Sequence, residues 1–183
     1  MSRKLEIVNI ISRFSFGDNL AINMRKLRDQ LSDYKYDRKF NRFFFGFKKP
    51  YGSITMYKTG NGISMGVKSV DDTRAIIRRL GRRLQKVGYK IRYNGYEITC
   101  IATTINVGHE LDLDELAKAA GSFCRFNPET FAGAIYQQDH LKITFFRNGK
   151  VNATGLRSLE EISECERYIL RLAELFKLNK SVD

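Results

Sequence analysis

Residues 127–155 read NPETFAGAIYQQDHLKITFFRNGKVNATG, which is three β-rich runs separated by two turns. The runs alternate apolar and polar residues, as half-buried strands do. A related pattern lies 89 to 91 residues earlier, where residues 36–66 read YDRKFNRFFFGFKKPYGSITMYKTGNGISMG. Ile54–Tyr57 pairs with Ile143–Phe146 at an offset of 89 residues, and Phe40 pairs with Phe131 at an offset of 91. The chain therefore contains two copies of one unit.

Outward from this stretch, both copies have the same order of elements. Residues 5–16 open the first copy as an expected strand, and residues 93–107 open the second. A helix should follow each strand, with apolar stripes formed by Leu20, Met24, Leu27 and Leu31, and by Leu113, Leu116, Ala117 and Ala120. A second helix closes each copy behind a Ser-x-x-acid cap at Ser69 and at Ser158. We predict two repeats, residues 1–92 and 93–183, that together make one domain.

The alternation in the strands predicts an antiparallel sheet with the helices on one face. If Ile54 and Met56 point to the helices, Thr55 and Tyr57 point away, and the same holds for Thr144 and Phe146 in the second copy. An uncovered face with large exposed aromatics is typical of a binding surface. The alternative is that these aromatics lie at the sheet edge under a loop.

Positive charge is concentrated in the first copy. The chain carries a net charge of +12; residues 1–92 hold 22 Lys/Arg against 7 Asp/Glu, and residues 93–183 hold 10 against 13. Such an excess favours a polyanionic partner, most often nucleic acid. A soluble basic protein without such a partner is the alternative.

Several classes of protein are disfavoured by what the sequence lacks. The three cysteines show no CxxC spacing, and no apolar run approaches 18 residues, so we expect a soluble protein in a reducing compartment. With His109 and His140 as the two histidines, a histidine-rich metal site is not expected, and no cofactor is expected. The sequence shows no nucleophile–base pair and no glycine-rich phosphate loop, so we do not expect an enzyme.

These residues resemble the core domain of the TATA-binding protein family. NPETFAGAIY is similar to the family segment PELFPGLIY, and FFRNGKVNATGLRS at residues 145–158 is similar to IF-SGK-V-TGAK. In the first copy, RKF at residues 38–40 and GVKS at residues 66–69 match, and the resemblance covers residues 5 to about 178. It implies an α+β saddle: two pseudo-symmetric repeats, a curved ten-stranded antiparallel sheet and four helices on the convex face.

The resemblance also implies the residues that contact DNA. The four positions that insert between base pairs in the family fall on Phe40, Tyr57, Phe131 and Phe146. Minor-groove contacts fall on Asn9, Ile11, Thr55, Ile63, Met65, Cys100, Ala102, Thr144, Asn152 and Thr154. Phosphate contacts fall on Lys39, Lys68, Lys150 and Arg157. A solvated surface charge is the alternative reading of each basic residue.

Some of these positions depart from the family pattern. Tyr57 stands for a phenylalanine, and its hydroxyl makes insertion between base pairs more costly. Cys100 and Met65 stand where the family has an asparagine and a threonine, so two of the four central polar groups are missing. Asn152 replaces an aliphatic residue. We therefore expect a relaxed sequence preference.

Partner surfaces follow from the same resemblance. Glu129 matches an acid that binds transcription factor IIB, and the basic helix face matches a docking surface for transcription factor IIA and for repressors; it comprises Arg74, Arg78, Arg79, Arg82, Arg83 and Lys86. A solvated charged helix is the alternative. The implied location is the nucleus, with archaeal cytoplasm and a viral factory left open.

We therefore expect a general transcription initiation factor. It should bind and bend A/T-rich promoter DNA as a monomer and nucleate a preinitiation complex. The main alternative is a divergent scaffold that recruits transcription factors with weak or no TATA specificity. Single units of this kind also occur in DNA glycosylases and some ribonucleases H, but this chain has no room for their catalytic domain.

Overall fold

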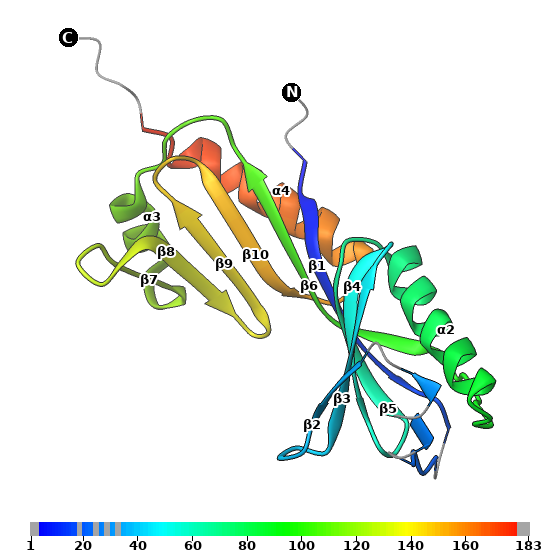
Figure 1. Ribbon diagram of the computed structural model, residues 1–183. Helices are drawn as coiled ribbons and strands as arrows, with labels where there is room; N and C mark the ends of the chain where they lie inside the picture. Colours follow the sequence, from blue (N-terminus) through cyan, green and yellow to red (C-terminus); the bar gives the residue numbers. More distant parts are fainter. Residues whose placement is uncertain (1–3, 18–19, 24–25, 28–29, 32–33, 179–183) are drawn as a thin grey trace. The chain divides into compact units, whose positions relative to one another are not determined.

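The computed structural model describes residues 4–17, 20–23, 26–27, 30–31 and 34–178, and the fold is built from ten strands (Figure 1). In chain order these are β1 (Glu6–Ser15), β2 (Tyr34–Asp37), β3 (Arg42–Lys48), β4 (Tyr51–Tyr57), β5 (Asn61–Val67), β6 (Tyr96–Asn106), β7 (Cys124–Asn127), β8 (Phe131–Gln138), β9 (Leu141–Phe146) and β10 (Lys150–Leu156). The helices are α2 (Val70–Lys86), α3 (Leu113–Ala120), the 3-10 helix η1 (Gly121–Phe123) and α4 (Leu159–Leu175).

The strands form one antiparallel sheet in the order β2-β3-β4-β5-β1-β6-β10-β9-β8-β7. This confirms the predicted ten-stranded sheet. The chain divides into two compact units, Val8–Thr99 and Met1–Ile7 with Cys100–Asp183. We call them the first unit and the second unit.

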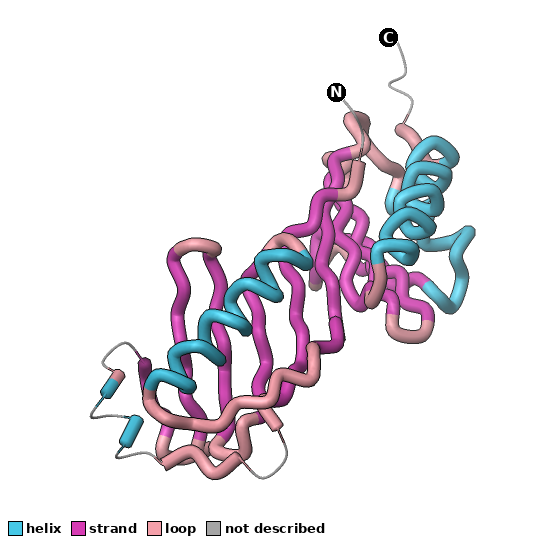
Figure 2. The backbone as a smooth tube through the Cα atoms, turned by 90° about the vertical axis from the view of Figure 1, so that its right-hand side faces the viewer, coloured by secondary structure: helices cyan, strands magenta, loops and turns pink. Residues whose placement is uncertain are grey.

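In the first unit, helix α2 covers one face of strands β4 and β5 (Figure 2). Strand alternation sends Phe43 and Phe45 of β3 to that face, where they are fully buried with Ile54 and Met56 of β4. From α2, Ile76 and Leu80 are buried at i and i+4 spacing. The Ser69 hydroxyl caps α2 by accepting the Asp72 N–H at 3.0 Å, as the predicted capping box requires.

The second unit is built in the same way. Helix α4 lies along one face of strands β9 and β10 (Figure 1), and Ile143, Phe145 and Val151 are fully buried. The Ser158 hydroxyl caps α4 by accepting the Glu161 N–H at 3.1 Å. Strand β6 begins at Tyr96 rather than Tyr93, because Gly95 has a φ of +94°, outside the extended region.

Four helices were expected, and the structure gives the bounds of three, α2, α3 and α4. Of the fourth, expected from Leu20 to Leu31, the described residues Lys26, Leu27 and Gln30 are helical. The Ile22 N–H donates to the Lys58 carbonyl at 2.9 Å, so this backbone is bound to the β4–β5 turn. Helical i to i−4 bonds appear from Asn23 onward, to Leu27 and then Leu31. Met24, part of the expected stripe, lies outside the described residues.

Two equivalent glycines differ in the space around them. Gly66 and Gly155 both follow the strand pattern at an offset of 89 residues and have φ values of +86° and +96°. A Cβ on Gly66 would lie 3.5 Å from the Gly52 Cα, an ordinary contact. A Cβ on Gly155 would lie 1.9 Å from the His140 carbonyl oxygen, where no atom fits. The second-copy hairpin is shorter by two residues, and its backbone passes directly over Gly155.

We predict that Gly155→Ala lowers stability more than Gly66→Ala. Both substitutions place alanine in the left-handed region, at about 1–2 kcal/mol each. Gly155→Ala also requires the backbone to move, which adds about 1–3 kcal/mol. Urea unfolding followed by circular dichroism measures the difference, and Gly66→Ala is the matched control. Equal losses of stability would contradict the close approach at His140.

Candidate nucleic-acid interface

The first unit exposes one face of its sheet through residues that alternate with the core. On β1, Asn9 and Ile11 are half-exposed, whereas Ile10 between them is fully buried. On β5, Ile63 and Met65 take the same outward positions. Thr55 of β4 lies between Phe44 of β3 and Ile63 of β5 in register and is only 8% exposed. The open face of this unit is therefore mainly apolar, with Asn9 as a polar group.

Asn9 has its side chain fixed by the neighbouring strand. Its Oδ1 accepts the backbone N–H of Gly66 at 2.7 Å. The amide nitrogen of this half-exposed residue keeps its two hydrogen-bond donors. The minor groove of an A·T pair presents acceptors, adenine N3 and thymine O2, so a fixed donor suits this partner.

The second unit presents a more polar open face. Cys100 and Ala102 of β6 are half-exposed, as are Thr144 of β9 and Thr154 of β10. Asn152 of β10 is paired within the protein, because its Oδ1 accepts the Thr104 hydroxyl at 2.9 Å. The departure at Asn152 thus creates a polar pair on this face, with the amide N–H₂ as its remaining donor.

Phe131 and Phe146 form a ring pair at one end of the second unit. Their centroids are 5.9 Å apart with the rings at 67°, and Phe131 is 45% exposed. Gly133 makes this contact possible, since a Cβ there would lie 2.8 Å from the Phe131 ring and 3.1 Å from the Phe146 ring. The two rings therefore present one apolar edge to solvent.

The corresponding place in the first unit is organised differently. Arg42 occupies the position that Gly133 has in the second copy, 91 residues later, and pairs in register with Tyr57. Its guanidinium lies 4.7 Å from the centroid of the Phe40 ring and forms an ion pair with Asp37 at 3.1 Å. The 55% exposed Phe40 is therefore covered in part by a cation.

Sequence reasoning did not select Arg42 as a site residue. The signal was present in the offset of 91 residues, which aligns Arg42 with a glycine that lies between two aromatic rings. The contacts of Arg42 with Phe40 and Asp37 become visible only in the tertiary structure.

The predicted phosphate-binding residues are all exposed. Lys39 lies beside the Phe40 ring at 5.4 Å, and Lys68 follows β5 in the first unit. In the second unit, Lys150 begins β10 and Arg157 follows its end. In each unit, one of these basic residues thus lies near the start of a strand and the other directly after the end of a strand.

The predicted basic face belongs to α2, in the first unit. Most of its cations are exposed, although Arg83 is half-buried, and burial lowers the pKa of its guanidinium. The exposed members are Arg74, Arg78, Arg79, Arg82 and Lys86. In the second unit, the acid Glu129 is exposed in the β7–β8 turn, where its backbone N–H donates to Asn127 Oδ1 at 3.0 Å.

Neither a metal centre nor a membrane segment is found in the part of the chain that the structure describes. Among those residues, no three His, Cys, Asp or Glu side chains are grouped so as to hold a metal ion. None of the described helices is both long and apolar enough to cross a membrane.

Comparisons with known proteins agree on one family. The family model described as transcription factor TFIID, or TATA-binding protein, matches residues 4–87 and 95–175. TATA-box-binding protein 2 of Entamoeba histolytica is 26% identical over 161 residues, covering 86% of this chain and 75% of that protein. The TATA-box-binding protein of Saccharomyces cerevisiae is 26% identical over 171 residues, covering 92% and 71%. The TBP structure from Methanococcus jannaschii superposes with a TM-score of 0.83 at 24% identity, covering 94% of this chain and 99% of that one.

Substitutions at Asn9 should separate its role in the fold from its outward donor. Asn9→Ala leaves the Gly66 N–H without its acceptor, which we expect to lower the free energy of unfolding by about 1–2 kcal/mol. Asn9→Asp keeps an acceptor oxygen and removes the donor, so its stability should stay near that of the original chain. Urea unfolding checks both variants, and an Asn9→Ala variant of unchanged stability would contradict the role of this bond.

Proposed function

This chain belongs to the TATA-binding protein family, and we propose that it binds A/T-rich promoter DNA through the minor groove and bends it. Bound in this way, it nucleates a transcription preinitiation complex. The family consists of DNA-binding transcription factors and not of enzymes. The residues of the open faces that depart from the family pattern set how strongly this protein prefers one DNA sequence over another.

The observation that carries the proposal is the exposed Phe131–Phe146 pair. Its centroids are 5.9 Å apart, on an open sheet face that also carries Thr144 and Thr154 and has Lys150 at the start of β10. An apolar edge of this size can enter a step between base pairs, and flexible steps such as TA open at least cost. The nearby cation attracts the phosphate backbone.

The polar groups on the open faces suit a groove that offers few distinguishing contacts. The minor groove separates A·T from G·C mainly by the guanine amino group, so shape and apolar contact supply most of the discrimination. Asn9 supplies donors to the A·T acceptors, whereas Met65 and Cys100 supply none of comparable strength. We therefore propose A/T preference with reduced selectivity for one particular sequence.

The two copies contribute differently to DNA binding. The second copy has the paired phenylalanine rings, and the first copy has Phe40 under Arg42 and a tyrosine at position 57. Residues 1–92 carry the whole excess of positive charge. We propose that the phenylalanine pair of the second unit is the stronger wedge, meaning the group that inserts between base pairs. The first unit adds long-range attraction to DNA.

Partner proteins are expected to bind outside the DNA-binding faces. The basic face of α2 suits acidic surfaces of a transcription factor IIA-like protein or a repressor, and exposed Glu129 suits a transcription factor IIB-like protein. We assign the protein to the nucleus, where the eukaryotic members of the family act.

A second candidate function is a scaffold that recruits transcription factors with weak or no TATA specificity. Tyr57, Met65 and Cys100 favour it, because each replaces a side chain that the family uses on DNA. The Phe131–Phe146 pair favours the first proposal.

Bending of a labelled duplex distinguishes the two functions. We expect a TATA duplex with dyes at its two ends to show increased energy transfer when the protein binds, and a scrambled duplex to show less. The measurement is energy transfer against protein concentration at fixed salt, since affinity depends on ionic strength. Equal binding to both duplexes without bending would reject the first proposal and leave the scaffold.

The wedge and the phosphate contacts should respond differently to substitution. Phe131→Ala or Phe146→Ala removes part of the apolar edge and should reduce the bend more than Lys150→Ala does. Lys150→Ala should instead lower the slope of log affinity against log salt by about 1, as expected for one phosphate contact. An intact bend after either phenylalanine substitution would contradict the wedge assignment.

A further inference from the structure

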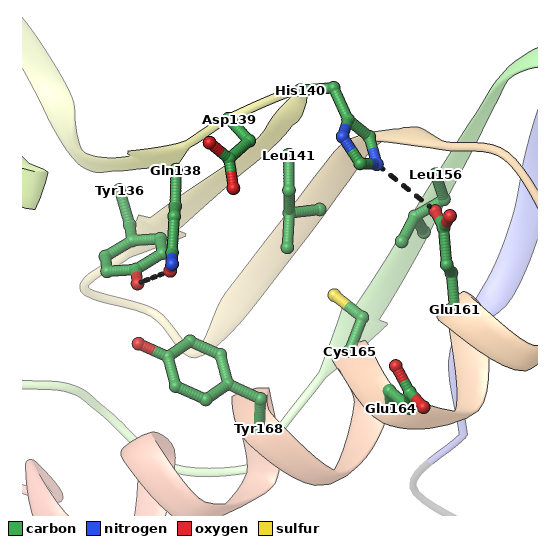
Figure 3. Close-up of a pocket in the computed structure, with 10 residues that line it drawn as sticks. All are labelled: Tyr136, Gln138, Asp139, His140, Leu141, Leu156, Glu161, Glu164, Cys165 and Tyr168. Atoms are coloured by element: carbon green, nitrogen blue, oxygen red, sulfur yellow. Dashed lines mark hydrogen bonds and ion pairs between the residues drawn. The ribbon is translucent and has the colours of Figure 1, made fainter.

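A pocket of about 410 Å³ lies in the second unit, between the β8–β9 hairpin and helix α4 (Figure 3). Its floor is apolar: Leu141 and Leu156 face Cys165 of α4. Tyr136 and Tyr168 close one end with ring centroids 5.5 Å apart, and the Tyr136 hydroxyl donates to Gln138 Oε1 at 2.7 Å. A ligand here would thus meet an apolar wall and an aromatic end.

Three carboxylates surround this apolar floor: Asp139 from the hairpin turn, and Glu161 and Glu164 from α4 (Figure 3). Glu161 is already engaged, since its Oε2 accepts the Arg157 backbone N–H at 2.8 Å and lies 3.5 Å from His140 Nε2. Asp139 and Glu164 have no ion-pair partner among the described residues. The rim therefore offers negative charge to a cation and repels a phosphate.

The first unit shows what occupies the equivalent place in the other copy. The caps Ser69 and Ser158 align α2 with α4 at an offset of 89 residues, so Arg79 corresponds to Tyr168 and Ile76 to Cys165. The Arg79 guanidinium lies 5.9 Å from the centroid of the Phe47 ring, and its Nη1 donates to the Lys49 carbonyl of the hairpin at 3.0 Å.

The second unit lacks the side chains that occupy this place in the first unit. Gln138 stands for Phe47 at an offset of 91 residues, and the smaller Cys165 stands for Ile76. Tyr168 stands for Arg79, so the guanidinium between helix and hairpin is lost. The second copy keeps the helix and the hairpin but has a hollow where the first copy holds an arginine.

We infer that this pocket binds an arginine side chain of a partner protein. The methylene stem would lie on Leu141 and Cys165, and the guanidinium would meet the Tyr168 ring and the carboxylates of Glu164 and Asp139. Arginine suits the pocket better than lysine because its planar guanidinium stacks on aromatic faces and is less strongly hydrated.

The Cys165 thiol is a neutral part of the floor. Burial raises its pKa to about 11, so it stays protonated at neutral pH and behaves as a small apolar group. The inferred site is separate from the DNA-binding faces, because Cys165 points to the helix-covered side of the sheet and is buried there.

Nuclear magnetic resonance titration of the full chain with short peptides tests this inference. The probe is acetyl-Leu-Arg-Leu-amide, and the control is the same peptide with citrulline, which has the shape of arginine without its charge. We expect the arginine peptide to shift the amide signals of residues 139–141 and 164–168, and to bind about tenfold more tightly than the citrulline peptide. Equal affinity of the two peptides would overturn the inference.

Variants assign the binding to the pocket. Glu164→Gln should weaken the arginine peptide about three- to fivefold, as expected for one exposed charge pair. Glu160→Gln, with the same change of charge on the same helix but outside the pocket, should leave the affinity unchanged. Equal weakening by both variants would indicate general charge attraction and would overturn the inference.

Tyr168→Arg restores the residue of the first copy and should block the pocket from within, so that the peptide no longer binds. Tyr168→Phe keeps the ring and should bind the peptide nearly as well as the original chain. A thermal melt of each variant verifies folding. Peptide binding that persists in a folded Tyr168→Arg variant would overturn the inference, whereas binding to a TATA duplex is measured separately and bears only on the DNA-binding proposal.

Discussion

Side chains along a β-strand point alternately to the two faces of the sheet, and the rest of this structure depends on that alternation. In each unit, helices cover the face that carries Ile54 and Met56 or Ile143 and Phe145, and these residues are fully buried. The residues that alternate with them along the same strands are then left on the open face. A shift of one residue would exchange the two sets, so core packing and the exposed surface are set by one register.

The two copies share this arrangement but differ in the side chains that they carry on each face of the sheet. The second copy pairs two phenylalanine rings over Gly133, whereas the first places Arg42 at the equivalent position, where its guanidinium covers Phe40. On the helix side the first copy again holds an arginine, Arg79, between helix and hairpin, and the second has a pocket there. The first copy thus has an arginine at both places, and the second copy has one at neither.

Much of the fold and part of the site could be predicted before any coordinates. The repeat, the strand order within it and the caps at Ser69 and Ser158 follow from local patterns, and the structure contains them. The helix expected from Leu20 starts later in the chain, because the Ile22 N–H bonds to the carbonyl of Lys58, a residue 36 positions away, and helical bonds begin at Asn23. Thr55 was expected at the groove, yet its neighbours in register, Phe44 and Ile63, leave it only 8% exposed.

By itself, the sequence determined the periodic features of this protein: two copies, the residues that alternate on each strand, and positive charge held by residues 1–92. These depend on spacing along the chain, which a sequence states directly. Only the tertiary structure decided that Asn9 bonds to Gly66, that Arg42 covers Phe40, and that a pocket opens beside Cys165. Each of these joins or separates side chains from different elements, and their distances are set by packing rather than by position in the chain.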